Sequence, residues 1–154
     1  MTSTQTTELE FRQAAETDLR PAYDVFVAAE GGVWDRQGLE WSAARFEVWS
    51  APLRHLLAED GERCFVAVDG GRLAGFSVAF ARGHTWFLSA LFVSPDYQGR
   101  RAGRELLDRS WRGEYTTRIT ITNSIQPTST SFYARRGLIP ATPILSISGS
   151  PTSD

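Results

Sequence analysis

The hydrophobic pattern of the chain predicts three consecutive strands near its middle. Thr85–Val93 is a near-continuous aromatic and β-branched run, which is typical of a buried strand. Cys64–Val68 and Leu73–Phe80 are two further apolar runs, and the tight-turn signal Asp69-Gly70-Gly71 separates them. Together these segments predict a three-strand meander at the centre of a sheet.

Apolar residues at helical spacing predict two helices before the meander. The first is expected to follow an N-cap at Thr17 and to stop at Gly31-Gly32. The second is expected from about Leu39 onwards. Pro52 should break or kink this helix, and Ser50 then caps its second half.

The remaining elements complete a mixed pattern. A third helix is expected to end near Gly113, and a fourth to span Pro127–Arg136, with Gly137 ending it. Shorter apolar stretches predict outer strands, which are Leu9–Ala14, Arg118–Thr122 and Ile144–Ile147. The predicted fold class is α/β (α+β), with a mixed, mostly antiparallel central sheet flanked by helices.

Length and composition indicate a single domain. The chain has 154 residues, of which 42% are hydrophobic and 12% aromatic, and this is enough to bury a core. We expect the domain to span residues 9–148, between a disordered leader (1–8) and a disordered tail (149–154).

Charge and cysteine content argue against several classes of protein. The net charge of −2 gives no reason to expect binding to nucleic acid or to an anionic membrane. No apolar run is long enough to span a bilayer and no signal peptide opens the chain, so a cytoplasmic location is expected. The chain has no lysine, a bias that favours a bacterial source. Cys64 is the only cysteine and is expected to be a core residue, and no metal site is predicted.

A polar turn follows the strand Thr85–Val93 and is the strongest candidate for a binding site. The turn reads Gln98-Gly99-Arg100-Arg101-Ala102-Gly103, and a helical pattern follows it. Because the first amides of a helix have no partner inside the helix, a strand–turn–helix unit directs N–H donors at an anion. The arginines add positive charge at the same place. This sequence therefore predicts a phosphate site, with a solvated surface turn as the simpler alternative.

This turn resembles the pyrophosphate loop of the GNAT superfamily of acyl-CoA-dependent N-acyltransferases, whose pattern is Gln/Arg-x-x-Gly-x-Gly/Ala. The preceding Phe92–Tyr97 resembles the family's approach to that loop. Arg101 departs from the pattern, because the family has glycine there, and a positive φ at this position would be strained. The resemblance runs from about Leu9 to Ile147 and implies the GNAT fold. One half of a tandem GNAT protein would look similar.

A second segment strengthens the resemblance. Gln126–Leu138 is similar to the family's Asn-x-x-Ala-x-x-Leu-Tyr-x-x-x-Gly-Phe segment, which flanks the thiol end of the cofactor. Tyr133 matches the tyrosine that commonly acts as general acid toward the departing thiolate, and a packed helix–sheet tyrosine is the alternative. Gln126 takes the asparagine position, where it would hydrogen-bond the cofactor or simply begin the helix.

The resemblance also implies how acetyl-CoA would bind. The backbone of Leu91, Phe92 and Val93 would pair with the pantetheine arm as if it were another strand. The amides of Gly99–Arg104 would bind the pyrophosphate, and the side chains of Arg100, Arg101 and Arg104 would add charge. The cofactor-binding set expected from both segments is Leu91, Phe92, Val93, Gln98, Gly99, Arg100, Arg101, Ala102, Gly103, Arg104 and Gln126.

The general base is not identified by the pattern. The family's glutamate position on the central strand resembles Ser89 here. His84 has a suitable ordinary pKa but also suits a turn. Acidic residues on the presumed acceptor side would attract a cationic amine. These acidic residues are Glu30, Asp35 and Glu40. Trp34, Trp41, Trp49 and Trp86 are candidates for an aromatic acceptor pocket, and Trp34 is the better one, because core packing explains Trp49 and Trp86 equally well.

The resemblance implies an N-acetyltransferase that moves an acetyl group from acetyl-CoA to a primary amine by direct attack. The alternative is a degenerate, non-catalytic GNAT domain that binds CoA or serves in assembly. The family often ends with one more strand, which this chain lacks after Ile144–Ile147, and this absence favours that alternative together with Ser89 and Arg101. Expected partners are a small-molecule or peptide amine acceptor, and either a second copy of the chain or another GNAT-like domain, because a missing strand would leave a sheet edge to cover.

Overall fold

A computed structural model describes residues 8–145. It divides into two compact units, the first ending at Ile121 and the second beginning at Thr122. The expectation of one domain over residues 9–148 stays a prediction. The expected disordered tail and most of the leader lie outside the described residues.

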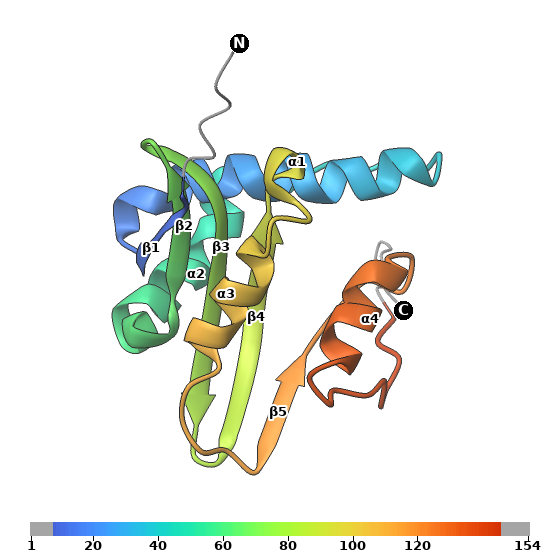
Figure 1. The fold of residues 1–154 in the computed structure, drawn as a ribbon. Helices are drawn as coiled ribbons and strands as arrows, with labels where there is room; N and C mark the ends of the chain where they lie inside the picture. The colour runs from blue at the N-terminus through green and yellow to red at the C-terminus, as the bar shows by residue number, and fades with distance from the viewer. Residues whose placement is uncertain (1–7, 146–154) are drawn as a thin grey trace, which may run out of the picture. The chain divides into compact units, whose positions relative to one another are not determined.

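The first unit is a five-stranded sheet with helices on both faces (Figure 1). The strands are β1 (Glu10–Gln13), β2 (Phe65–Asp69), β3 (Arg72–Arg82), β4 (Thr85–Val93) and β5 (Thr117–Thr120), in that order across the sheet. All neighbours are antiparallel except β4 and β5, which are parallel. The mixed, mostly antiparallel sheet and the three-strand meander are therefore confirmed.

Helices α1 (Leu19–Arg36) and α2 (Phe46–Asp60) cover one face of the sheet, and α3 (Ala102–Ser110) covers the other (Figure 1). The period of two along β2 explains how one strand serves both faces. Val66 and Val68 join the core under α1 and α2, whereas Phe65 and Ala67 join a second core with Leu106 of α3.

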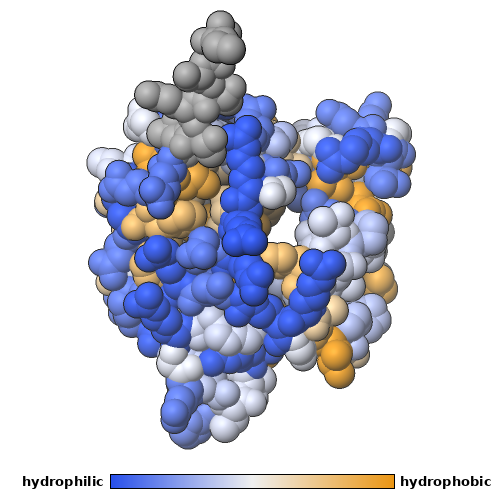
Figure 2. All heavy atoms as spheres, in the orientation of Figure 1, coloured by the Kyte–Doolittle hydropathy of each residue, from blue (hydrophilic) through white to orange (hydrophobic). Residues whose placement is uncertain are grey.

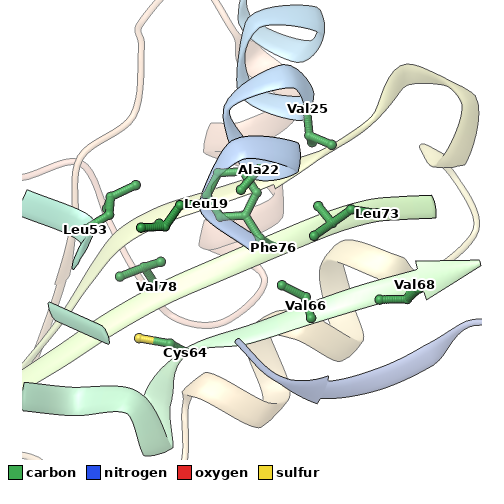
Figure 3. Packing of buried hydrophobic residues seen from close by; sticks show 10 residues of the cluster. All are labelled: Leu19, Ala22, Val25, Leu53, Cys64, Val66, Val68, Leu73, Phe76 and Val78. Atoms are coloured by element: carbon green, nitrogen blue, oxygen red, sulfur yellow. The ribbon is translucent and has the colours of Figure 1, made fainter. Parts of the chain in front are cut away.

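The larger core lies beneath α1 and α2 and is shown in Figure 3. Leu19, Ala22 and Val25 of α1 meet Phe76 and neighbouring strand residues there. The Phe76 side chain is 2% exposed, and burying an aromatic side chain of this size contributes about 2–3 kcal/mol to folding. The helices α1 and α2 thus pack on one face of the sheet, and α3, which follows the glycine turn, packs on the other.

The structure corrects four local predictions at the N-terminal side. Helix α1 continues through Gly31-Gly32 to Arg36, and the small size of Gly31 suits the packing there, because a Cβ would lie 3.4 Å from the ring of Trp41. Thr17 is not the N-cap. It lies in a short 3-10 helix (Glu16–Asp18), and Asp18 precedes α1.

Helix α2 begins at Phe46 rather than near Leu39, and Pro52 does not end it. A proline removes the hydrogen bond to the carbonyl four residues earlier, which here belongs to Val48. Val48 is 58% exposed, so water can solvate that carbonyl. Ser50 caps nothing, because it lies within the helix and its buried hydroxyl has no hydrogen-bond partner in residues 8–145.

The second unit contains α4 (Pro127–Ala134), and Gly137 follows it with φ 82°. This confirms the fourth helix and its glycine end, although the helix stops two residues before Arg136. The predicted last strand is wrong for Ile144 and Leu145, which adopt no regular structure, and residues 146–147 of that prediction lie outside the described residues.

No helix in the described part of the chain is long and apolar enough to cross a membrane. The face drawn in Figure 2 is mostly hydrophilic, and its hydrophobic residues appear as separate areas.

Candidate active site

The turn between β4 and α3 presents backbone amides that have no acceptor. The Arg101 carbonyl accepts the first hydrogen bond of α3 from the Glu105 amide, at 3.0 Å. The amides of Ala102, Gly103 and Arg104 donate to no protein acceptor among residues 8–145. Such amides at a helix start carry partial positive charge and bind anions.

Short-range contacts fix this turn against the end of β4. The Gln98 side-chain amide donates to the Val93 carbonyl at 3.1 Å. Gly99 has φ 79°, a conformation that favours glycine. Gly103 lies close to β4, since a Cβ at this position would be 3.5 Å from the Val93 side chain. The structure therefore brings Val93, Gln98 and Gly103 together.

Three arginines with no ion pair in the described residues lie in or next to the segment that holds the free amides. The side chains of Arg100, Arg101 and Arg104 are exposed, and none forms an ion pair within residues 8–145. The Arg100 guanidinium lies over the Tyr97 ring, 5.5 Å from its centroid. The turn is thus a concentration of unpaired positive charge beside unpaired N–H donors, which suits a diphosphate.

The edge of β4 beside this turn is open. β5 pairs with β4 only over Thr85–Leu88, and the rest of β4 has no strand partner on that edge in the described residues. Across the other edge, Ala90 pairs with Val78 and Leu88 with Ala79. Ser89 therefore has no counterpart and forms a bulge, with an exposed side chain. Leu91, Phe92 and Val93 follow the bulge as an extended segment that pairs with β3 on one edge and with no strand on the other, where the Val93 carbonyl accepts the Gln98 side chain.

A hollow of about 620 Å³ lies in the same unit, at the end of α1. It is lined by the last turn of α1 and the α1–α2 connection, through Asp35, Gly38, Leu39, Glu40, Trp41 and Ser42. Trp41 contacts Phe26 edge-to-face at 5.7 Å, and Phe26 contacts Phe92 of β4 in the same manner at 5.1 Å. Two aromatic contacts therefore connect the hollow to the open segment of β4.

Of the other acceptor-side residues, Glu30 and Trp34 form a pair. The Trp34 indole N–H donates to the Glu30 carboxylate at 3.0 Å, between successive turns of α1. Trp34 belongs to the helix and does not line the hollow, whereas Trp41, another of the candidate aromatic residues, does.

The second unit holds the two remaining predicted residues. Gln126 is the N-cap residue of α4, and its side-chain oxygen accepts a hydrogen bond from the Ser129 hydroxyl. Tyr133 is 9% exposed and its ring lies 5.3 Å from that of Phe132. Its carbonyl accepts the Arg136 and Leu138 amides, so the helix end fixes its position.

Two further candidates, His84 and Cys64, have structural roles. The His84 carbonyl accepts the amides of Thr116 and Thr117, and its exposed side chain lies in the β3–β4 turn. Cys64 is fully buried, and burial raises the pKa of its thiol to about 11. It is a core residue, as expected, and an unreactive one.

Comparisons with known proteins agree with this arrangement. Residues 60–137 match the family model of the acetyltransferase (GNAT) domain, which is just over half of the chain. A search of curated proteins finds no match.

Solved structures with similar folds share little sequence with the chain. Aminoglycoside N-acetyltransferase AAC(6′)-Iy in complex with CoA has TM-score 0.67 and 16% identity, and the match covers 96% of this chain and 99% of that one. PaiA N-acetyltransferase from Thermoplasma acidophilum in complex with coenzyme A has TM-score 0.66 and 17% identity, covering 84% and 88%. A putative acetyltransferase from Pyrococcus horikoshii has TM-score 0.65 and 16% identity. That match covers 82% of this chain but only 42% of the other, which is therefore much longer.

The family match spans the meander, the glycine turn and the Tyr133 helix, and the folds agree over most of the chain. The chain therefore belongs to the GNAT family of acetyltransferases.

Proposed function

We propose that this chain transfers the acetyl group of acetyl-CoA to a primary amine. The observation that carries the proposal is the juxtaposition of the free amides of Ala102–Arg104 with the open edge of Leu91–Val93. The diphosphate would meet the amides and the unpaired arginines, and the pantetheine amides would pair with the strand edge. A similar fold is known in complex with CoA.

In the proposed reaction the amine nitrogen attacks the thioester carbonyl carbon directly. A C–N bond forms, the C–S bond breaks, and the sulfur leaves with the bonding electron pair. Tyr133 would donate a proton to this thiolate, and the proton that the acetylated nitrogen loses would restore the Tyr133 hydroxyl through solvent. The acceptor ammonium must first lose a proton, and Ser89 supplies no carboxylate for this step, so we assign that proton to water.

The acceptor is proposed to enter through the hollow beside α1. Asp35 and Glu40 place two carboxylates on its wall, and Trp41 adds an aromatic face. Carboxylates and indole rings both attract ammonium groups. AAC(6′)-Iy is known with a bisubstrate analogue of CoA and acetylneamine, and a cationic amine of that general kind suits this hollow. Asp35→Asn/Glu40→Gln should raise KM for a cationic amine more than for a neutral one.

Calorimetric titration with acetyl-CoA tests the cofactor site. Wild type should bind saturably, and Gly99→Glu/Gly103→Glu should not. Gly61→Glu/Gly83→Glu is the matched control, because it adds the same charge at one ordinary and one positive-φ glycine, both with open space around the Cβ position. A folded wild type that does not bind acetyl-CoA would refute the proposal in favour of an assembly role.

Tyr133→Phe tests catalysis separately from binding. The variant keeps the ring contact with Phe132 and loses only the hydroxyl. In a thiol-release assay over a panel of amines, kcat should fall about 10²-fold while the Kd for acetyl-CoA stays the same. An unchanged kcat would remove Tyr133 from the mechanism. Binding without turnover on any amine would favour the non-catalytic alternative.

A further inference from the structure

Tyr97 is a buried residue that directly precedes the glycine turn. Its side chain is 7% exposed, and its hydroxyl donates to the Asp69 carboxylate at 2.9 Å. Asp69 ends β2, so this hydrogen bond ties the turn after β4 to the turn between β2 and β3. The amide of Tyr97 donates to the Ser94 carbonyl at 2.9 Å, which fixes the backbone as well.

Two arginines contact the ring of Tyr97, and only one of them also forms an ion pair with a carboxylate. The Arg72 guanidinium lies 5.8 Å from the ring centroid and forms an ion pair with Asp96 at 2.9 Å. The Arg100 guanidinium lies 5.5 Å from the same centroid and has no carboxylate partner in residues 8–145. Arg72 is therefore neutralised, whereas Arg100 keeps its full charge.

This difference matters for anion binding. An arginine that is held by a carboxylate spends its donors and its charge on that partner. An arginine that is held over an aromatic ring uses the ring's π cloud and keeps its N–H donors for another ligand. The aromatic contact orders a long side chain without neutralising it, and so lowers the entropy that binding would otherwise cost.

We propose that Tyr97 is a positioning residue that holds Arg100 ready for the diphosphate of acetyl-CoA. The Asp69 hydrogen bond fixes the ring, and the ring in turn orders the guanidinium. The inference rests on the proposed cofactor site and assigns to it a residue outside the glycine turn itself.

A double-mutant cycle tests the coupling of Tyr97 and Arg100. Tyr97→Leu removes the ring and should weaken acetyl-CoA binding about fivefold. Arg100→Gln should weaken it about tenfold or more. In the Arg100→Gln background, Tyr97→Leu should change the Kd by less than about twofold, because the group that it orders is already gone. Additive losses would overturn the proposal.

Three controls separate positioning from a general structural role. Tyr97→Phe keeps the buried ring and loses only the hydrogen bond to Asp69, so it should weaken acetyl-CoA binding by no more than about twofold, less than Tyr97→Leu. Phe80→Leu removes another ring that an arginine, Arg82, contacts, and it should leave the Kd unchanged. KM for S-acetylpantetheine, which lacks the diphosphate, should be the same for wild type and Tyr97→Leu. A rise in that KM would show that Tyr97 acts on the whole site.

Salt dependence gives a second readout. Added salt should weaken acetyl-CoA binding by wild type more steeply than binding by Arg100→Gln, and Tyr97→Leu should fall with Arg100→Gln. If Tyr97→Leu does not fold, Arg100→Lys serves instead, since it keeps the charge but lacks the planar guanidinium. It should bind acetyl-CoA more weakly than the control Arg104→Lys.

The outcomes distinguish the two proposals. Wild type that does not bind acetyl-CoA overturns both the cofactor site and the role of Tyr97. Wild type that binds acetyl-CoA, with additive effects of Tyr97→Leu and Arg100→Gln, overturns only the role of Tyr97.

Discussion

The Arg12 guanidinium makes two hydrogen bonds to the Asp18 carboxylate, with Nη1 2.7 Å from Oδ2 and Nη2 2.8 Å from Oδ1. Arg12 belongs to β1 and Asp18 immediately precedes α1. The Ala15 amide donates to the same carboxylate at 2.8 Å. One largely buried carboxylate therefore holds the outer strand, the connection and the first helix together.

Asp18→Asn should lower the free energy of unfolding by about 1–2 kcal/mol, because it breaks a two-bond ion pair and weakens the bond from the Ala15 amide. Urea denaturation measures the loss. Asp24→Asn is the control, since its 4.0 Å contact with Arg20 is exposed on both sides and should contribute less than about 0.5 kcal/mol. Equal losses in the two variants would contradict the expectation that the Asp18 carboxylate contributes more to stability than the exposed Asp24 carboxylate.

The Asp18 ion pair also predicts a pH dependence. Burial opposes ionisation of the carboxyl, but the hydrogen bonds from Arg12 and Ala15, with the charge of Arg12, outweigh it and lower the pKa of Asp18. Its stabilisation is therefore complete above the unfolded pKa of about 3.9 and disappears as the pH falls through the lower folded value. Denaturation curves from neutral to acid pH should show wild type and Asp18→Asn converging. A constant difference would argue against this ionisation.

The elements that could be predicted from the sequence are those that nearby residues determine. The run Thr85–Val93 is apolar at nearly every position, and its strand has the predicted bounds. Gly137 ends α4 because its positive φ is cheap for glycine alone. The glycine turn could likewise be predicted from the sequence, because its conformation depends on residues within it.

Features set by distant residues could not be predicted in this way. Gly31-Gly32 looks like a helix end, yet α1 continues there and packs Trp41 against Gly31. The bulge at Ser89 arises from the register between β3 and β4, which no single strand encodes. Tyr97 meets Asp69 across 28 positions of sequence. These contacts depend on tertiary packing, which overrides local propensity.

Gly75→Ala should be strongly destabilising. A Cβ at Gly75 would lie 2.8 Å from the Phe92 carbonyl oxygen and 3.2 Å from side-chain atoms of both Leu106 and Val93. Because the closest of these is backbone in an adjacent strand, we expect a loss of about 2 kcal/mol or more. Gly61→Ala, with ordinary φ and open space, is the matched control and should be neutral in the same thermal or urea denaturation. A neutral Gly75→Ala would mean that β4 does not approach so closely.

Cys64 should resist thiol reagents in the native protein. Its side chain is fully buried, and burial raises the pKa of the thiol to about 11, so little thiolate forms at neutral pH. Labelling by an aromatic disulfide reagent should be slow in buffer and fast in denaturant. Rapid labelling of the native protein would show that the core around Cys64 opens readily.

Arg101→Gly should stabilise the fold while weakening cofactor binding. Arg101 is the only non-glycine residue with positive φ among residues 8–145, at 65°, and such a conformation costs about 1–3 kcal/mol. Glycine relieves the strain but adds freedom to the unfolded chain, so the net gain should be about 0.5–1 kcal/mol. Arg100→Gly removes the neighbouring arginine from a position without positive φ and should give no gain. The midpoint of urea denaturation should rise for Arg101→Gly alone.

The Kd for acetyl-CoA should increase for both variants, since each removes an unpaired guanidinium beside the free amides. A rise in stability with unchanged affinity would limit Arg101 to a tolerated replacement for glycine.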